Sequence, residues 1–367
     1  MNAPTPTSIP TIAPRFHSLH VKDLRRETAD AVSLSFDIPP ALADAFRFSP
    51  GQYLTLRATI GGEDVRRSYS ICSGPDEPDL RVAVKRVDDG IFSSHVNTAL
   101  QVGDRLDVMT PTGRFGLAEG VSGTTYVGFA AGSGITPILS ILKGVLAREP
   151  AARFFLFYGS RSVDDVLFRR ELEELKDRHI GRFSVFHVLS REEQDLAVLN
   201  GHLDGDKVRL LLRTVLPAAL VDQAFICGPA AMIDDLSATL ADLGLAPEKI
   251  HVERFVSAHG GIARAKPAVA PDAAPAHAII ITVDGKRREV PAADGEAILD
   301  AALRAGIDLP FACKGGMCST CRARVVEGSV AMDVNYSLEP WELEKGFVLT
   351  CQAKCTSERV VVDFDAV

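Results

Sequence analysis

The cysteines near the C-terminal end are the side chains in this sequence best suited to metal chemistry. Cys313, Cys318 and Cys321 follow a C-x4-C-x2-C pattern, and 29 residues separate Cys321 from Cys351. This spacing is typical of the thiolate ligands of a 2Fe–2S cluster. The paired glycines between the first two cysteines have no Cβ, so backbone N–H groups of the loop could approach anionic sulfur closely. The pattern therefore predicts that these four cysteines are cluster ligands.

A four-thiolate zinc site is the alternative. Cys318 and Cys321 could be joined by Cys351 and Cys355, which are also closely spaced. That set would not include Cys313 and would not explain why two glycines stand side by side in the loop. The sequence therefore favours the iron–sulfur cluster, with Cys355 as a spare thiol, and a zinc-binding redox-sensing module is the competing hypothesis.

Composition narrows the class of protein. Seven cysteines in 367 residues are an odd and sparse number for a disulfide-bonded protein, and the first twenty residues contain no apolar segment typical of a secretory signal. A reducing cytoplasmic location is expected. The net charge is −8 without a basic block, which argues against a nucleic acid partner. No run of 18 apolar residues exists, so no membrane-spanning segment is expected.

Two segments in the first third of the chain could bind a flavin. Arg67 to Ser70, with the sequence RSYS, stands at the expected end of a strand, and by itself could be an ordinary half-buried strand. Lys85 precedes Ser93 and Ser94, at which a helix is expected to begin. Small residues at a helix N-terminus suit a pyrophosphate, because the backbone N–H groups and the helix dipole favour negative charge there.

Two further segments could bind a dinucleotide. Gly132 and Gly134 follow an apolar strand and precede a helix with Pro137 in its first turn. Glycines at this place let the backbone approach a ligand, although the segment is not the GxGxxG fingerprint and could be a plain strand-to-helix turn. Cys227 to Pro229 ends another apolar strand, where Cys227 could equally be a small buried residue.

The choice of coenzyme depends on the segment Tyr158 to Ser162 at the end of the second apolar strand. A 2′-phosphate requires a guanidinium and a hydroxyl group, whereas NAD enzymes often place an acidic residue against the ribose. Ser160 and Arg161 therefore predict NADPH, with NADH as the alternative. Ser162 is also a candidate helix N-cap, with Asp165 completing a capping box.

The hydrophobic pattern predicts a multidomain protein, because the spacing of apolar residues changes its character twice along the chain. Short alternating segments separated by turn residues indicate an antiparallel β-barrel, and alternating apolar strands and amphipathic helices indicate an α/β domain with a parallel sheet. The expected parts are a flavin barrel over residues 1–119, ordered from about residue 14, a nucleotide domain over 120–256, an Ala/Pro-rich linker over 257–277 and a cluster domain over 278–367.

Several elements of these domains can be placed individually. Helices are expected over 136–147 and 164–177 in the nucleotide domain. In the cluster domain we expect a hairpin that turns at Asp284 and Gly285, and a short helix that is stopped by Gly306.

The motifs also resemble known families. Residues 14–255 resemble the ferredoxin–NADP reductase superfamily, with PGQY, RSYS, GSGITP and CGPAAM in order, and residues 278–367 resemble a plant-type ferredoxin domain of the β-grasp fold. The resemblance implies that Arg67 meets the FAD pyrophosphate, that Tyr69 packs on the isoalloxazine and that Ser70 bonds the flavin near N5. The residues expected to bind FAD or the nicotinamide coenzyme are Arg67, Ser68, Tyr69, Ser70, Val84, Lys85, Phe92, Ser93, Ser94, Gly132, Ser133, Gly134, Thr136, Pro137, Ser160, Arg161, Cys227, Gly228, Pro229 and Phe255.

This order of domains predicts an oxidoreductase that takes electrons from NADPH, through FAD and the 2Fe–2S cluster, to another protein. No residue is expected to act as a nucleophile or general base. Di-iron sites need paired Glu-x-x-His motifs on helices, and the single occurrence here, Glu248 to His251, leads into a strand. The whole chain is similar to reductase subunits of multicomponent oxygenases, particularly those serving phenylacetyl-CoA epoxidase. The resemblance implies a di-iron oxygenase component as the acceptor, with another aromatic or alkane oxygenase as the alternative.

The charges near the cluster suggest a docking face. From Ala278 to Val367 there are 14 acidic and 10 basic residues, yet Lys314, Arg322 and Arg324 lie beside the expected ligands. Transient redox partners rely on charge to steer association. We therefore expect these three cations to contribute to docking of the oxygenase component.

Overall fold

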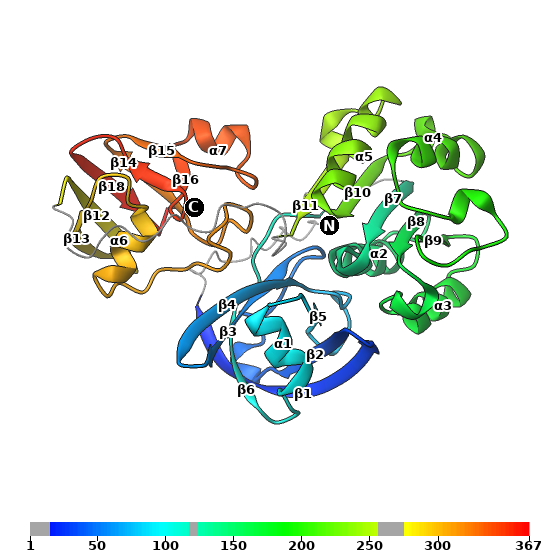
Figure 1. The fold of residues 1–367 in the computed structure, drawn as a ribbon, viewed down its shortest axis with the longest axis horizontal. Coiled ribbons are helices and arrows are strands. Elements are labelled where there is room, and N and C mark those ends of the chain that lie inside the picture. Colours follow the sequence, from blue (N-terminus) through cyan, green and yellow to red (C-terminus); the bar gives the residue numbers. More distant parts are fainter. Residues whose placement is uncertain (1–14, 117–123, 256–274, 367) are drawn as a thin grey trace, which may run out of the picture. The chain divides into compact units, whose positions relative to one another are not determined.

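The computed structural model describes residues 15–116, 124–255 and 275–366 (Figure 1). The described residues form two compact units, one from His17 to Phe255 and one from Pro275 to Ala366 together with Arg15 and Phe16. The larger unit contains a barrel and a parallel sheet, and the smaller unit contains a mixed five-stranded sheet and a two-stranded sheet.

The first sheet of the larger unit is a six-stranded barrel in the order β4-β3-β6-β1-β2-β5. An antiparallel bridge between Ile71 and Val82 joins the end of β4 to β5, which closes the sheet. Leucine, valine and phenylalanine side chains that alternate along the strands fill its interior. Its elements are β1 (Phe16–Thr28), β2 (Ala31–Asp37), η1 (Pro40–Leu42), β3 (Tyr53–Ile60), β4 (Glu63–Ser70), β5 (Arg81–Lys85), α1 (Ile91–Thr98) and β6 (Arg105–Met109).

The second sheet has five strands, in the order β11-β10-β7-β8-β9, and every pairing is parallel. Helices α2 and α3 pack on one face and α4 and α5 on the other (Figure 1). Both faces are therefore buried, which explains the nearly continuous apolar strands. The elements are β7 (Thr125–Ala131), η2 (Gly132–Gly134), α2 (Ile135–Arg148), β8 (Arg153–Ser160), η3 (Val163–Asp165), α3 (Arg169–Arg178), β9 (Phe183–Leu189), η4 (Ala197–Leu199), α4 (Gly205–Thr214), η5 (Ala218–Leu220), β10 (Gln223–Gly228), α5 (Ala230–Asp242), η6 (Pro247–Lys249) and β11 (Ile250–Arg254).

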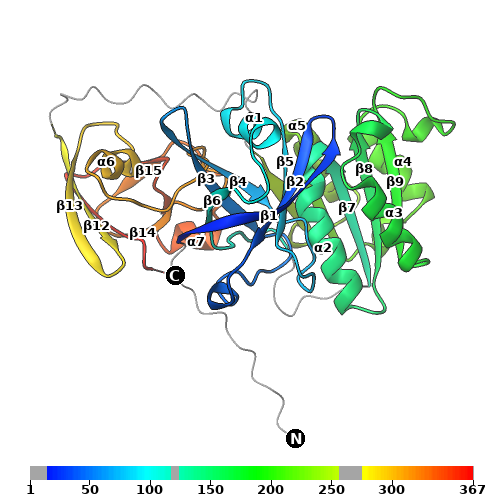
Figure 2. The same ribbon diagram turned by 90° about the horizontal axis from the view of Figure 1, so that it is seen from below.

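The smaller unit has a mixed five-stranded sheet in the order β13-β12-β18-β14-β16, with β12 and β18 parallel at its centre. Helix α6 packs against β13 and β17. Figure 2 shows α6 beside β13. The expected hairpin is confirmed, because Asp284 and Gly285 both have positive φ between β12 and β13. The elements are β12 (His277–Val283), β13 (Lys286–Ala292), α6 (Ile298–Arg304), β14 (Arg322–Glu327), β15 (Val330–Met332), α7 (Pro340–Glu344), β16 (Phe347–Leu349), β17 (Ala353–Cys355) and β18 (Arg359–Asp363).

One helix starts later than its sequence predicts. The segment expected to be helical over 164–177 begins with the short turn η3, and α3 starts only after Phe168, whose φ is 57°. This left-handed residue separates the two helical segments. The expected capping box at Ser162 is also wrong, because the Ser162 hydroxyl donates to the Asp165 carboxylate instead of accepting from a backbone N–H.

Other expectations for the elements hold. Helix α2 covers the expected residues 136–147 and has Pro137 in its first turn, and α6 ends just before Gly306, which has φ 72°. Of the expected linker, residues 257–274 lie outside the described residues, and β12 already begins at His277.

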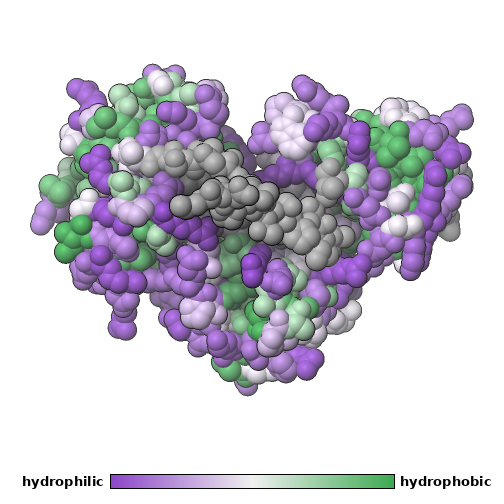
Figure 3. Space-filling view, turned by 180° about the vertical axis from the view of Figure 1, so that it is seen from behind, coloured by the Kyte–Doolittle hydropathy of each residue, from purple (hydrophilic) through white to green (hydrophobic). Residues whose placement is uncertain are grey.

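One face of the molecule is mostly polar. On the face drawn in Figure 3, hydrophilic residues predominate and hydrophobic ones form separate patches. Within the described part of the chain, no helix combines the length and apolar character that are needed to span a membrane.

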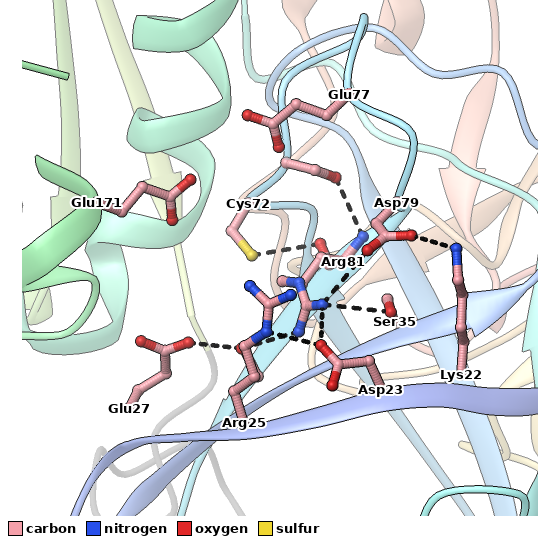
Figure 4. Close-up of polar contacts among 12 residues, drawn as sticks. Lys22, Asp23, Arg25, Glu27, Ser35, Cys72, Glu77, Asp79, Arg81 and Glu171 are labelled. Carbon is pink, nitrogen blue, oxygen red and sulfur yellow. Dashed lines mark hydrogen bonds and ion pairs between the residues drawn. The ribbon is translucent and has the colours of Figure 1, made fainter. Parts of the chain in front are cut away.

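A buried arginine anchors one side of the barrel. Arg81 of β5 contacts the carboxylates of Asp23 at 2.5 Å and Asp79 at 3.6 Å, and donates to the hydroxyl of Ser35 (Figure 4). It also donates to the hydroxyl of Ser33. These partners come from β1, β2 and the loop before β5. The arginine therefore ties neighbouring strands together through groups that satisfy its charge.

A buried lysine joins the barrel to the parallel-sheet domain. Lys143 of α2 lies 3.0 Å from Glu77, in the barrel loop before β5, and 2.5 Å from Glu171 of α3. It also donates to the backbone oxygen of Cys72 at 3.0 Å. Burial lowers the pKa of Lys143, but the two carboxylates outweigh this and the pKa is raised. The ammonium group therefore stays charged and links the two halves of the larger unit.

Candidate functional site: a flavin, a nucleotide and a cluster site

The RSYS segment is the last half of β4. Arg67 is exposed, with Nη1 held at 2.7 Å from the backbone oxygen of Arg66. The Tyr69 ring packs against Phe92 of α1 with centroids 5.8 Å apart, and burial raises the pKa of its hydroxyl. An exposed guanidinium beside a partly covered aromatic ring suits the charged and planar parts of FAD.

The end of β4 meets a carboxyl group that sequence analysis missed. Ser70 donates its hydroxyl to Glu253 of β11 at 3.1 Å, across 183 residues of sequence. Glu253 is paired in register with Cys227 of β10. Burial raises the pKa of Glu253 to about 8, and the hydrogen bond from Ser70 lowers it only in part. The available signal was an acidic residue in a strand of the parallel sheet, where burial makes a carboxylate unfavourable unless it has a special role.

Cys227 is also fully buried in this region. Burial raises the pKa of its thiol well above the ordinary value. The thiol is therefore neutral and no candidate nucleophile.

The loop before α1 supports the second flavin segment. The Ser93 hydroxyl accepts from the backbone N–H of Val87 at 3.1 Å and donates to the backbone oxygen of Gly90 at 3.2 Å. Val84 and Phe92 are buried in the barrel core. Ser93 therefore shapes the loop at the N-terminus of α1, and Val84 and Phe92 could meet a cofactor mainly through their backbone.

The turn from β7 to α2 lies directly against the end of β10. A Cβ on Gly134 would lie 2.1 Å from the backbone oxygen of Cys227, so only glycine permits this approach. Gly132 has φ 54°, and nothing lies within 4 Å of the place where its Cβ would be. The turn thus leaves an open, Cβ-free backbone surface at the carboxyl ends of parallel strands, where ligands of such sheets bind.

Four further expected residues belong to the parallel-sheet domain. Gly228 packs closely on Ala131, and Pro229 is the N-cap residue of α5. Thr136 donates to the backbone oxygen of Ser133 at 2.9 Å. Phe255 is half-buried and packs on the core beneath α2.

The coenzyme segment stands at the end of β8. Ser160 is buried, whereas the Arg161 side chain is 44% exposed. Arg161 forms ion pairs with Asp165 and with Asp30 of the β1–β2 turn. The expected cation is therefore present at the edge of the sheet, but it is already paired with two carboxylates.

The four expected cluster cysteines come together as two pairs. The Cys318 thiol donates to Cys313 and the Cys321 thiol donates to Cys351, and these hydrogen bonds lower the pKa of Cys313 and of Cys351. Two thiol pairs match a centre with two metal ions, each held by two thiolates. Within residues 15–116, 124–255 and 275–366, no three His, Cys, Asp or Glu side chains surround one metal position.

The backbone of the cluster loop also fits anionic sulfur. The N–H of Gly315 donates to Cys313 Sγ at 3.3 Å, and that of Gly316 is directed to Cys351. Gly316 has φ 76°, and a Cβ there would press on Val334 at 3.1 Å. The glycines thus allow the close wrapping that the sequence predicts.

Cys355 stands apart from this group. It lies in β17 and belongs to the hydrophobic core of the smaller unit. Burial raises the pKa of its thiol to about 11. It belongs to neither thiol pair, so the zinc set that would require it is not brought together.

The expected basic docking face is only partly present. Arg322 contacts Glu342, which is fully buried, at 2.6 Å and packs over the Phe347 ring. Lys314 is 40% exposed and lies 2.9 Å from Asp300, and Arg324 donates to the backbone oxygen of Lys345. Arg322 is thus a structural residue, and the expectation that its charge faces a partner is wrong.

Family models match all three parts of the chain. An oxidoreductase FAD-binding domain matches residues 18–116, an oxidoreductase NAD-binding domain matches 129–238, and a 2Fe-2S iron-sulfur cluster binding domain matches 281–356. The chain is therefore an oxidoreductase that binds FAD, a nicotinamide coenzyme and a 2Fe–2S cluster. The last match decides against the zinc module.

Relatives extend over nearly the whole chain. The 1,2-phenylacetyl-CoA epoxidase of Escherichia coli K12 has a component that is 44% identical over 353 residues, which cover 96% of this chain and 98% of the relative. The ferredoxin reductase component of the 3-ketosteroid-9-alpha-monooxygenase of Mycolicibacterium smegmatis is 35% identical over 95% of this chain and 96% of its own. The solved structure of a phthalate dioxygenase reductase has the same fold, with TM-score 0.59 and 22% identity over 95% of this chain and 98% of its own.

The chain belongs to this family of three-domain reductase components of oxygenases. Membership confirms the predicted barrel, parallel-sheet and ferredoxin architecture and the predicted role in electron transfer.

Proposed function

We propose that this chain oxidises NADPH and delivers electrons to the di-iron oxygenase component of a phenylacetyl-CoA epoxidase, in the cytoplasm. The observation that carries the proposal is the 44% identity with a component of such an epoxidase over 96% of the chain. The bound groups supply the redox chemistry, because FAD accepts a hydride and a 2Fe–2S cluster carries one electron at a time.

The protein contributes binding and positioning. We propose that Arg67 holds the FAD pyrophosphate, that Tyr69 covers the ring system and that Ser70 lies near its reactive edge. The contacts of β4 with α1 support this, because they hold these side chains along one strand. The proposed ligands of the cluster are Cys313, Cys318, Cys321 and Cys351, supported by their pairwise contacts.

The proposed acceptor is a separate protein. His251 is hydrogen-bonded to Gln223 at 2.7 Å and stacks on Phe225, so the histidine of the single Glu-x-x-His sequence is held in the sheet. Because Glu248 lies in η6 and His251 in β11, the two side chains do not share a helix face. The oxygen chemistry is therefore assigned to the oxygenase component.

The preference for NADPH is proposed from Arg161 and Ser160 at the end of β8. A guanidinium is the natural partner of a 2′-phosphate. Arg161→Ala should raise KM for NADPH roughly ten- to a hundredfold, the value of one charge-assisted contact, and should leave NADH nearly unchanged. Equal losses with the two coenzymes would refute the preference.

A 3-ketosteroid monooxygenase is the second candidate for the oxygenase that is served, because its reductase component is 35% identical to this chain. The test is reconstitution of the purified full-length protein with each oxygenase component, NADPH and either phenylacetyl-CoA or a 3-ketosteroid. Coupled NADPH oxidation and product formation with phenylacetyl-CoA alone are expected. Turnover of the steroid alone would reassign the partner.

A further inference from the structure

Asp30 is placed between two cations that belong to different elements. It lies in the two-residue turn between β1 and β2, where Thr28 pairs with Ala31. Its Oδ2 is 2.9 Å from Arg161 Nη2, at the end of β8, and 3.7 Å from Lys85 Nζ, at the end of β5. A carboxylate that bridges a guanidinium and an ammonium group occupies the kind of position that suits a phosphate.

Neutral groups hold this carboxylate in place. The Thr28 hydroxyl, which is buried, donates to Asp30 Oδ1 at 2.8 Å. The backbone N–H of Arg86 donates to the backbone oxygen of Asp30 at 2.6 Å. The turn is therefore anchored to the barrel, and the carboxylate orientation does not depend on the cations alone.

Arg161 has a second carboxylate partner within its own segment. Asp165 contacts the guanidinium and also accepts from the Ser162 hydroxyl. Burial raises the pKa of Asp165, but the hydrogen bonds from Arg161 and Ser162 outweigh it and the pKa is lowered, so the carboxyl group is charged. A 2′-phosphate that approaches Arg161 would meet two negative charges, of which one comes from the flavin barrel.

We propose that Asp30 sets the preference between NADPH and NADH by competing with the coenzyme 2′-phosphate for Arg161. NADH lacks the phosphate, so it leaves the Asp30–Arg161 contact intact, and the carboxylate suits a ribose hydroxyl. NADPH has to displace this carboxylate. The inference rests on the proposed function, in which a nicotinamide coenzyme reduces the flavin of this chain.

The test is reduction of the flavin by NADPH and by NADH, followed anaerobically by absorbance in the full-length protein with its cofactors. Asp30→Asn keeps the size of the side chain and removes the charge. It should raise the ratio of kcat/KM for NADPH to that for NADH about tenfold, the value of one contact to a charged group. Asp30→Glu keeps the charge and should keep a ratio near that of the natural protein. Asp44→Asn is the control for net charge, because among the ion pairs of the described residues Asp44 pairs only with Arg47.

Direct binding separates the phosphate contact from the reaction. In calorimetry, Asp30→Asn should tighten binding of 2′,5′-ADP but not of 5′-AMP, and adding Arg161→Ala should cancel the gain. The role of Asp30 would be refuted by equal changes in the affinity for the two ligands. It would also be refuted by an unchanged coenzyme ratio in an Asp30→Asn protein whose flavin is reduced normally. In both cases the proposed function would stand. If neither coenzyme reduces the flavin of the natural protein, the proposed function and this inference fall together.

Discussion

Cys313, Cys318, Cys321 and Cys351 contact one another in pairs, whereas Cys355 lies in a hydrophobic core. Replacing any of the four by Ser should abolish cluster assembly, because one of the two irons would lose a thiolate. FAD should stay bound and reducible by NADPH, since the flavin residues belong to the other compact unit. Iron content and visible absorption measure the outcome. Cys355→Ser is the control and should keep the cluster; iron loss in this variant, with iron retained in Cys313→Ser, would refute the ligand assignment.

Glu253 makes the stability of the larger unit depend on pH. Its pKa is raised from 4.5 to about 8, so the folded state holds this proton more tightly than the unfolded state. Its contribution is fully present below pH 4.5 and is lost as the pH rises towards 8.

Between pH 4.5 and about 8, the free energy of unfolding should therefore fall less steeply with pH in Glu253→Gln than in the natural protein. Denaturant unfolding of the full-length protein, followed by flavin fluorescence at several pH values, measures the slope. Glu248→Gln removes a neighbouring exposed carboxyl group and should leave the slope as it is. An unchanged slope in Glu253→Gln would show that another group titrates.

At the scale of elements, the contact of η2 and α2 with the end of β10 depends on one glycine. Gly134→Ala would place a Cβ 2.1 Å from the Cys227 backbone oxygen. Either the helix or the strand end must move, which should cost about 1–3 kcal/mol of stability and weaken coenzyme binding. Gly159→Ala in β8 is the matched control, because its Cβ would meet its nearest neighbour at an ordinary 3.4 Å. Thermal unfolding and KM for NADPH measure both effects, and similar behaviour of the two variants would contradict the argument.

At the scale of the whole molecule, electron transfer to the oxygenase component should slow as ionic strength rises, because transient redox encounters are steered by charge. Reduction of the flavin by NADPH should change less. Lys314→Glu, beside a cluster cysteine, should slow the partner step, and Lys286→Glu on β13 is the control with the same change of charge. Rapid mixing with the oxygenase component at several salt concentrations measures both steps. A partner step that responds neither to salt nor to Lys314→Glu would refute docking through this face.

Arg322 is unsuitable for this test. Its reversal would leave Glu342 buried without its cation, and loss of one partner of a buried pair costs about 3–5 kcal/mol. A slower partner step in such a variant would report damage to the cluster domain.

Local patterns in the sequence determined the chemistry and the order of the domains. The cysteine spacing, the Asp284–Gly285 turn and the alternation of apolar strands with helices depend on neighbouring residues and on periodicity, which a single sequence shows directly. The early start predicted for α3 was wrong, because the helical period of the sequence continues through Phe168. Packing decides the backbone conformation of this residue, which is left-handed.

Only the tertiary structure decided which charged groups meet. Glu253 reaches Ser70 across 183 residues and Arg161 reaches Asp30 across 131, in both cases between the barrel and the parallel sheet. Arg322 lies beside a cluster cysteine in sequence, yet it turns to Glu342 and Phe347. No local pattern records these contacts, because the distance between two elements, and the burial that shifts a pKa, arise only when the sheets and helices pack together.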